Sequence, residues 1–366
     1  MDFSKYGHPS PQWLAFVAAN PSAAEEGSSG NDPSTALELQ QAVNSFRDKA
    51  SAKVFAESGF ESQLDISTTS LPSRHGHLIP VRRYSPKQDA PRAGDQGTRN
   101  QRSLIYFHGG GFLFGTETSE DPLCAKFALD AGISVYSVNY SHTPQHVFPV
   151  AHDDALDVYN HISENSTLYG IDTPSGQLAV LGISAGANLA AEFVQHDVAR
   201  AKADPSHRRI VSGAVLSIPW LIHGDHTPLH LMESPEKASS RQCRDAPVLP
   251  WPRLQLFVNL LKMEDSADPR ISAALRPDSE LEGWPKTGFI IAGMDPLRDD
   301  GLIFAKRLEA LKTSTSVHIF PGVPHGFRRW VDLPFSKQSD DVTVDLIRWA
   351  LGLETNVSIE GWHEYA

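Results

Sequence analysis

The residues best suited to chemistry lie at positions 182–186, which have the sequence Gly-Ile-Ser-Ala-Gly. An apolar run at Leu178 to Gly182 predicts a strand, and residues Ala185 to Ala201 predict a helix. A G-x-S-x-G pattern between a strand and a helix is typical of a nucleophile elbow, where a sharp turn exposes a serine hydroxyl. Both glycines are needed because a Cβ at either position would clash with neighbouring backbone. Ser184 is therefore the predicted nucleophile, and an ordinary turn with a serine helix cap is the alternative.

A serine hydroxyl is a weak nucleophile at neutral pH and needs a base, normally an imidazole oriented by a carboxylate. After a nucleophile elbow, the carboxylate and then the histidine follow the serine along the chain. This order excludes the histidines at positions 108, 142, 146, 152 and 161. His325 lies between the last predicted strand, Val317 to Phe320, and the last predicted helix, Ser339 to Leu351, and is the predicted base. For the other downstream histidines, at positions 223, 226, 230, 318 and 363, surface or packing roles suffice.

The predicted carboxylate is Asp295, which comes just after the strand predicted at Gly288 to Ala292. The carboxyl ends of parallel strands face the active site in sheets of this kind. Asp299 is the alternative partner. Asp299 and Asp300 stand where a helix should begin, so helix capping and the helix dipole account for them. Ser184, Asp295 and the base together form a predicted catalytic triad.

A run of three glycines follows another predicted strand, Ser103 to Phe107, within residues 106–112, which have the sequence Tyr-Phe-His-Gly-Gly-Gly-Phe. Ester cleavage develops negative charge on the carbonyl oxygen, and donors fixed around that atom stabilise it. Consecutive glycines let backbone N–H groups approach such an oxygen without obstruction. A flexible turn or a phosphate cradle is the alternative, but no Lys-Ser/Thr pair or dinucleotide spacing follows. Together with the elbow, this run predicts acyl transfer.

Short apolar runs alternate here with longer amphipathic stretches, which is typical of a mainly parallel sheet flanked by helices. The other predicted strands are Leu64 to Thr69, Leu78 to Tyr84, Ser134 to Asn139 and Val211 to Ile218, and the other predicted helices are Thr35 to Glu57, Glu120 to Ala131, Val150 to Glu164, Arg253 to Leu261 and Gly301 to Lys312. The polar stretch Ser85 to Arg102 is expected to be a mobile loop. The insertion Leu221 to Lys262 is longer than an ordinary connection and is predicted to form a lid.

The composition is that of an ordinary globular protein, with 40% hydrophobic and 21% charged residues. The formal net charge of -12 and the thin spread of Lys and Arg argue against nucleic-acid binding. Cys124 and Cys243 have neither the number nor the spacing of a disulfide framework or metal site. No run of about 18 apolar residues and no apolar leader is visible, so we expect no stable membrane insertion and a cytoplasmic location.

Four motifs make the chain similar to the hormone-sensitive-lipase-like (HGGG-motif) carboxylesterases of the α/β-hydrolase fold, from about Leu64 to Leu351. They are His-Gly-Gly-Gly at 108–111, Gly-Ile-Ser-Ala-Gly at 182–186, Asp-Pro-Leu-Arg-Asp at 295–299 and His-Gly-Phe at 325–327. The resemblance implies an α/β fold with a mainly parallel eight-stranded sheet flanked by helices and covered by a helical cap. It also implies that no metal or cofactor is needed.

On the matching positions, the resemblance implies the triad already predicted, with oxyanion donors from the backbone of Gly110, Gly111 and Ala185, and a structural role for His108. Two stretches depart from the family. Ile183 stands where the family elbow usually carries Asp, and residues 139–145 lack an Arg and a Glu that are common there. These departures put substrate preference and loop rigidity in question more than the reaction class.

The implied organisation divides the chain into five segments. They are an N-terminal cap segment (1–60), a first part of the hydrolase core (61–220), a cap insertion (221–262), a second part of the core (263–354) and a C-terminal tail (355–366). The apolar residues beside the motifs or in the lid are candidates for the substrate pocket, and each of them could equally belong to the core: Phe112, Leu113, Trp220, Leu221, Phe257 and Phe327.

The leading hypothesis is a serine carboxylesterase or lipase-like hydrolase (EC 3.1.1) that acts through an acyl-enzyme intermediate on a small to medium apolar ester. A tailoring hydrolase or thioesterase for one specialised metabolite is the second hypothesis, suggested by Ile183 and the long lid. The third is a non-catalytic small-molecule receptor, which retention of all three triad residues disfavours. The natural substrate, the chain-length preference and the oligomeric state, including a homodimer, stay open.

Overall fold

The computed structural model describes residues 1–87, 102–171, 177–355 and 359–366. Within them, one nine-stranded sheet has the order β1-β2-β4-β3-β5-β6-β7-β8-β9. Strand β2 pairs antiparallel with β1 and β4, and every other neighbouring pair is parallel. The strands are β1 (Leu64–Pro72), β2 (Leu78–Pro86), β3 (Arg102–Phe107), β4 (Ser134–Val138), β5 (Gln177–Ile183), β6 (Val211–Ser217), β7 (Lys286–Met294), β8 (Thr315–Pro324) and β9 (Gly361–Glu364).

The central strands form where apolar residues predominate and almost every residue is buried. All five residues of β4 are buried, and so are five of the six residues of β3. Parallel strands covered on both faces carry such continuous runs, whereas half-exposed strands alternate. Strand β1, at the edge, buries only Leu64 and Leu71 and carries polar residues between them. The centre of the sheet is therefore the core of the molecule, and β1 is an exposed margin.

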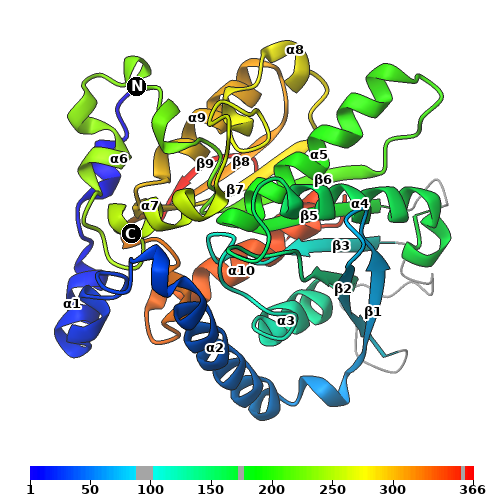
Figure 1. The fold of residues 1–366 in the computed structure, drawn as a ribbon, viewed down its shortest axis with the longest axis horizontal. Helices are drawn as coiled ribbons and strands as arrows, with labels where there is room; N and C mark the ends of the chain where they lie inside the picture. Colours follow the sequence, from blue (N-terminus) through cyan, green and yellow to red (C-terminus); the bar gives the residue numbers. More distant parts are fainter. Residues whose placement is uncertain (88–101, 172–176, 356–358) are drawn as a thin grey trace.

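Helices cover both faces of the sheet (Figure 1). Helices α4, α5 and α9 share one hydrophobic cluster with the sheet, and α3 and α10 share the other. Helix α10 starts with Pro334 at its first position, and α3 ends before Gly132, whose φ is +69°. The helices are α1 (Pro11–Ala19), α2 (Ala36–Ser58), α3 (Asp121–Ala131), α4 (Val150–Glu164), α5 (Ala185–Ala203), α6 (Ser239–Gln242), α7 (Trp251–Leu261), α8 (Asp278–Leu281), α9 (Arg298–Ala310) and α10 (Pro334–Ala350).

The expected sheet is present, but it has nine described strands rather than eight. Residues 355–366, expected as a tail, include β9, which pairs in parallel with β8. Directly after β9 in the chain, the ring of Tyr365 stacks on Phe320 with a centroid distance of 4.5 Å, and its Oη lies 2.6 Å from Nδ1 of His318. Four residues are too few to show a periodic pattern in the sequence. The strand is held by these long-range contacts.

Two further boundaries differ from the expectation. Of the predicted loop Ser85 to Arg102, Ser85 and Pro86 extend β2 and Arg102 begins β3, while positions 88–101 lie outside the described residues.

None of the helices in the described part of the chain is both long and apolar enough to cross a membrane.

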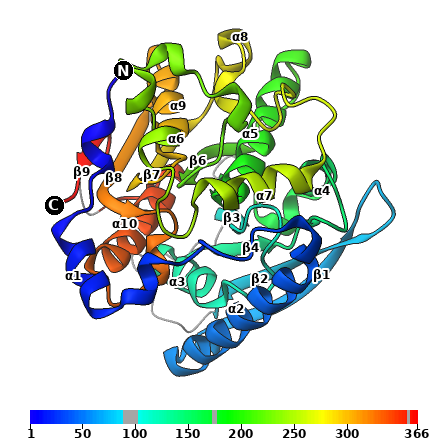
Figure 2. The ribbon, with the colours of Figure 1, turned by 60° about the vertical axis from the view of Figure 1, so that its left-hand side comes forward.

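The N-terminal segment and the insertion after β6 contact each other. The amino group of Met1 donates to the carbonyl of Leu231 at 2.5 Å, and Asp2 forms an ion pair with Lys237 at 2.7 Å. In Figure 2, helices α2 and α7 cross in front of the strands on the same side of the molecule. These two segments therefore lie together, although more than 150 residues separate them in the sequence.

Candidate active site

Three buried side chains meet at the carboxyl edge of the sheet. Ser184 comes just after β5, Asp295 just after β7 and His325 just after β8. Ser184 Oγ lies 2.9 Å from Nε2 of His325, whose Nδ1 lies 2.7 Å from Oδ2 of Asp295. With Nδ1 protonated, the ring donates to the carboxylate and Nε2 is free to accept the serine proton. The structure thus brings together the three residues that the sequence singled out.

The turn at the serine is strained and leaves no room for larger residues. Ser184 has a φ of +56° and a ψ of -119°, outside the regions that L-residues prefer. A Cβ on Gly182 would lie 2.1 Å from the carbonyl oxygen of Gly186, and one on Gly186 would lie 2.1 Å from that of Phe107. The serine N–H donates to Ser217 O at 2.8 Å. Close backbone on both sides therefore imposes the turn that exposes the hydroxyl.

Asp295 is oriented by the backbone that follows it. Its Oδ1 accepts a hydrogen bond from Leu297 N at 2.8 Å, which leaves Oδ2 directed at His325. The side chain is only 1% exposed, so little water competes for these oxygens. The carboxylate is therefore held in the orientation that a histidine partner needs.

Asp299 and Asp300 lie in the first turn of α9, where the helix dipole favours acidic residues, but the expectation that they cap this helix is wrong. The N-cap position of α9 is Leu297, and no side chain caps it. Asp299 Oδ2 instead accepts a hydrogen bond from Ser239 N at 2.6 Å, and Asp300 Oδ2 accepts one from each N–H of residues 221–222 at 2.9 Å. Both carboxylates are buried and accept hydrogen bonds from the backbone of the insertion. They therefore attach the insertion to the segment that contains Asp295.

The glycine run passes directly over the elbow. Gly110 and Gly111 have φ values of +146° and +64°, which favour glycine. A Cβ on Gly111 would lie 2.3 Å from the ring of Phe257 in helix α7, and one on Gly109 would lie 3.5 Å from Cβ of Ser184. The loop is therefore enclosed between α7 and the serine, and only glycines fit at its centre.

His108 supports the beginning of this loop. Its ring stacks on Tyr140 at 4.4 Å and on His142 at 5.2 Å, and Nδ1 lies 3.2 Å from the carbonyl oxygen of Gly109. A Cβ on Gly115 would collide with the ring. Burial lowers the pKa of His108 to about 3, so the ring is neutral at physiological pH.

Helix α2 makes a set of contacts with the glycine loop that no functional motif in the sequence indicates. One polar face of the helix hydrogen-bonds the chain from Gly109 to Thr118. The bonds are Gln40 Nε2 to Leu113 O at 2.7 Å, Asn44 Oδ1 from Gly115 N at 2.9 Å, Arg47 Nη1 to Gly109 O at 3.3 Å, Asp48 from the hydroxyl of Thr116, and Ser51 Oγ to Thr118 O at 2.6 Å. The only trace in the sequence is the three- and four-residue spacing of these side chains.

The six candidate pocket residues are all buried, but they do not form one group. Five of them belong to the hydrophobic cluster on the α5 side of the sheet: Phe112, Leu113, Trp220, Leu221 and Phe257. Phe327 belongs to the opposite cluster and packs on Phe320 at 5.2 Å, because the chain turns toward α10 after His325. Phe327 is thereby separated from the other candidates.

The departure at position 183 has a visible packing partner. A Cβ on Gly109 would lie 3.2 Å from Cγ2 of Ile183, so the isoleucine lies against the glycine loop. It is a partly buried neighbour of the cluster on the α10 side. Ile183 thus supports the loop through apolar packing, without a polar group.

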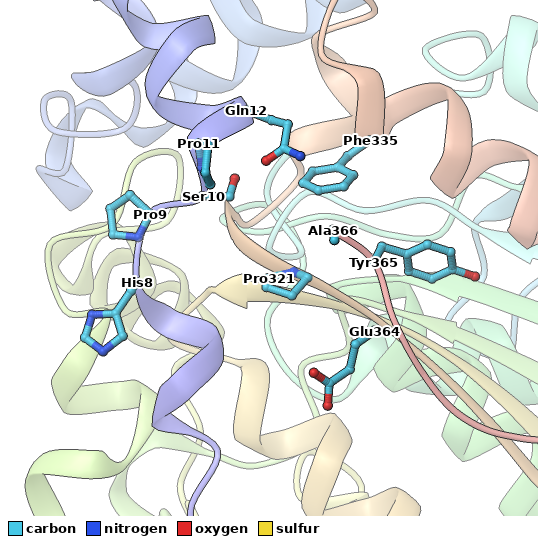
Figure 3. A pocket seen from close by; sticks show the side chains of 10 residues that line it. All are labelled: His8, Pro9, Ser10, Pro11, Gln12, Pro321, Phe335, Glu364, Tyr365 and Ala366. Atoms are coloured by element: carbon cyan, nitrogen blue, oxygen red, sulfur yellow. The ribbon is translucent and has the colours of Figure 1, made fainter.

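A cavity of about 480 Å³ lies elsewhere, where the segment before α1 meets the end of β8 and the C-terminal residues (Figure 3). Its lining consists of His8, Pro9, Ser10, Pro11, Gln12, Pro321, Phe335, Glu364, Tyr365 and Ala366. Ser184, Asp295 and His325 are not among these residues, so this cavity is separate from the candidate active site.

Comparisons with known proteins agree on one family. A profile described as alpha/beta hydrolase fold matches residues 104–329. Ethyl acetate hydrolase from Pseudomonas putida is 33% identical over 297 residues, 81% of this chain and 85% of that protein. Carboxylesterase NlhH from Mycobacterium tuberculosis is 31% identical over 68% of this chain and 71% of that protein.

Solved structures resemble most of the chain. A bacterial heroin esterase superimposes with a TM-score of 0.74 at 25% identity, over 94% of this chain and 99% of that one. Esterase LipW from Mycobacterium marinum gives a TM-score of 0.70 at 27% identity, over 87% of this chain and 90% of that one. The similarity therefore extends well beyond the short motifs.

Proposed function

Because the chain belongs to the hormone-sensitive-lipase-like carboxylesterases of the α/β-hydrolase fold and is a carboxylic-ester hydrolase, we propose that Ser184 is its nucleophile, with His325 as base and Asp295 as the orienting carboxylate. The observation that carries this assignment is the continuous hydrogen-bonded chain from Asp295 Oδ2 through the imidazole to Ser184 Oγ. The distances are within the range of proton transfer between a serine and a general base.

Acylation begins when Ser184 Oγ attacks the ester carbonyl carbon and its proton passes to Nε2 of His325. The resulting imidazolium is stabilised by the buried Asp295 carboxylate. When the tetrahedral intermediate collapses, the bond to the alcohol oxygen breaks and the imidazolium gives that oxygen its proton. The products of this half-reaction are the free alcohol and an acyl group bonded to the serine.

Deacylation repeats the same steps with water. His325 Nε2 takes a proton from the water molecule, whose oxygen attacks the acyl carbon. Collapse of the second intermediate releases the acid, and the proton returns to Ser184 Oγ. One base therefore serves both half-reactions, and the cycle consumes one water for each ester.

We assign the oxyanion donors to the backbone N–H groups of Gly110, Gly111 and Ala185. The positive φ values of both glycines and their position over the elbow support this assignment. Ala185 begins α5, so its N–H is one of the free donors at a helix N-terminus. Donors fixed before the reaction stabilise the oxyanion without reorganisation.

We propose that residues 1–60 and 221–262 form one cap over the site and that the substrate is a small to medium apolar ester. The enclosure of the glycine loop by Phe257 and the buried aromatic residues Phe112 and Trp220 support an apolar and limited space. The name of ethyl acetate hydrolase describes a relative that acts on a small ester. No observation favours a thioesterase or a receptor.

A panel of p-nitrophenyl esters tests the substrate proposal. We expect kcat/KM to be highest for acetyl or butyryl esters and to fall steadily toward octanoyl and dodecanoyl esters. Matched thioesters should be hydrolysed more slowly. A maximum at dodecanoyl, or a preference for thioesters, would overturn the proposed substrate class without affecting the assignment of Ser184.

A further inference from the structure

Two of the three proposed oxyanion donors belong to peptide groups whose carbonyl oxygens accept backbone hydrogen bonds. The N–H of Gly111 shares its peptide with Gly110 O, which accepts from Leu113 N at 3.1 Å and Phe114 N at 2.9 Å. The N–H of Ala185 shares its peptide with the carbonyl of the nucleophile. That oxygen accepts from the N–H groups of residues 187 and 220 at 2.9 and 3.3 Å.

The third peptide has a charged partner in addition to a neutral one. Its carbonyl oxygen lies 3.2 Å from Nδ1 of the neutral His108 ring. The N–H of Gly110 shares its peptide with Gly109 O, which accepts a hydrogen bond from Nη1 of Arg47 at 3.3 Å. Arg47 is in helix α2, 62 residues before Gly109 in the sequence. The N-terminal segment thus places a guanidinium group at the carbonyl end of a peptide whose N–H is one of the proposed oxyanion donors.

A chain of opposite charges holds this guanidinium group in place. Arg47 Nη2 lies 2.7 Å from Glu120 Oε1, and Glu120 Oε2 lies 3.5 Å from Nη1 of Arg328. Arg328 pairs in turn with Asp340 at 2.6 Å and stands three residues after His325. The side chains of Arg47 and Glu120 are only about one-fifth exposed, at 23% and 20%, so solvent screens the pair incompletely.

Hydrogen bonding at an amide oxygen changes the amide N–H. A donor on the oxygen draws electron density from the nitrogen, and successive hydrogen bonds strengthen one another by about 10–30% per bond. A cationic donor has a larger effect than a neutral one, especially where water is excluded. The benefit grows as the substrate oxygen gains negative charge, so it acts on the transition state more than on the bound ester.

We propose that Arg47 is a positioning residue for ester hydrolysis, which polarises the Gly109–Gly110 peptide and so strengthens the Gly110 N–H as an oxyanion donor. The proposal rests on the proposed function, because it requires Gly110 to face the substrate oxygen. Arg47 touches neither substrate nor nucleophile and acts only through the peptide. Glu120 holds Arg47 in place but does not itself polarise the peptide.

Three substitutions separate polarisation from simple bracing. Arg47→Gln removes the charge at the peptide, Glu120→Gln breaks the same ion pair but leaves the arginine, and Lys49→Met removes a cation from an exposed position of the same helix. We expect Arg47→Gln to lower kcat about tenfold with KM nearly unchanged. Glu120→Gln loosens the guanidinium group without removing it and should lower kcat by clearly less than Arg47→Gln does, whereas Lys49→Met should stay within about twofold of the wild type.

A trifluoromethyl ketone supplies the second readout, because the serine adds to it and forms a tetrahedral anion without turnover. In Arg47→Gln its inhibition constant should rise by the same factor by which kcat falls, while the inhibition constant of the product acid stays constant. Equal losses of kcat in Arg47→Gln and Glu120→Gln, or a change confined to KM, would overturn the proposal.

Two controls keep the result decisive. If thermal melting shows that Arg47→Gln is unfolded, Arg47→Met, which also removes the charge but keeps an unbranched side chain, replaces it. A parallel change in kcat and ketone affinity then supports the proposal, and a change in neither or in KM alone overturns it. Ser184→Ala tests the proposed function separately: retained turnover in that variant would refute the nucleophile whatever Arg47 does.

Discussion

The two halves of the candidate active site are held in different ways. The side chains of the proposed triad each come just after a strand of the sheet, at Ser184, Asp295 and His325, and backbone contacts set the directions of the first two. The loop from Gly109 to Thr118 is held largely by side chains of helix α2. One half is thus fixed by local backbone sterics, and the other depends on a segment that is distant in sequence.

This difference predicts two kinds of response to substitution. A change in the half built on strand ends should abolish turnover or folding, because no alternative backbone path exists at the elbow. A change in the polar face of α2 should weaken transition-state stabilisation by modest factors, because several side chains share the task. The two regions can therefore be separated by the size of the effects.

Asp295→Asn should give the largest effect, with kcat lower by about 10⁴-fold, because the amide favours the wrong tautomer of His325. Asp299→Asn is the matched control, since Asp299 accepts a hydrogen bond from Ser239 in the insertion and does not contact the imidazole of His325. It should lower the melting temperature and leave kcat within about tenfold of the wild type. Equal losses of kcat in the two variants would show that the acid is wrongly assigned.

Gly186→Ala should come next, because the new Cβ would lie 2.1 Å from Phe107 O and 2.4 Å from His108 O. We expect the free energy of unfolding to fall by about 3 kcal/mol or more. Gly132→Ala is the control: its φ is also positive, at +69°, but nothing lies within 4 Å of the added atom. It should cost only about 1–2 kcal/mol in urea denaturation. Similar losses in both variants would contradict a steric origin.

Gln40→Ala tests the other half of the comparison. Its buried amide donates to the carbonyls of Leu113 and Thr143 at 2.7 and 2.9 Å. Leaving these acceptors unsatisfied should lower the free energy of unfolding by about 2 kcal/mol and reduce kcat only a few-fold. Gln41→Ala, at an exposed neighbouring position, should change neither quantity. If Gln40→Ala abolished turnover, the loop would be as rigidly specified as the elbow.

The last prediction concerns pH and the stability of the fold, with no expected change in the candidate active site itself. Burial lowers the pKa of His108 and His318 to about 3 and that of His152 to about 4, from an ordinary value of 6.5. Unfolding therefore takes up protons at these sites below pH 6.5, and stability falls as pH falls. Each histidine contributes about 1.4 kcal/mol per pH unit in that window.

Urea midpoints measured between pH 7.5 and pH 5 check this expectation. Burial also raises the pKa of Asp300, which opposes the slope. Replacing His318 by Gln should make the slope shallower by the share of one histidine. Stability that stays constant or increases toward pH 5 would contradict neutral buried imidazoles.

Much of the sheet, and the three residues that meet at its carboxyl edge, could be predicted from the sequence. Short apolar runs indicated the parallel strands up to β8, a turn between two extended stretches indicated the pair β1 and β2, and helix α4 has the predicted bounds, Val150–Glu164. The elbow carries its own steric signal in two glycines around Ser184. Features of this kind are encoded by neighbouring residues, so one sequence is enough to recognise them.

Other features depend on partners that the local sequence does not show. Strand β9 has only four residues and forms because β8 offers a free edge. Asp299 and Asp300 stand at a helix start, where capping is the ordinary explanation, yet they bind the insertion. The polar face of α2, which includes Gln40 and Arg47, has the spacing of a solvated helix surface. Only the contacts of this face with the glycine loop distinguish it from a solvated helix surface.

Covalent labelling with a fluorophosphonate, followed by intact-protein and peptide mass spectrometry, tests the central claim most directly. The account predicts one adduct per wild-type chain, on the peptide that contains Ser184, and none in Ser184→Ala. Labelling should be strongly slowed in Asp295→Asn and nearly unchanged in Asp299→Asn. An unlabelled wild type, or an adduct that persists in Ser184→Ala, would contradict the assignment of the nucleophile.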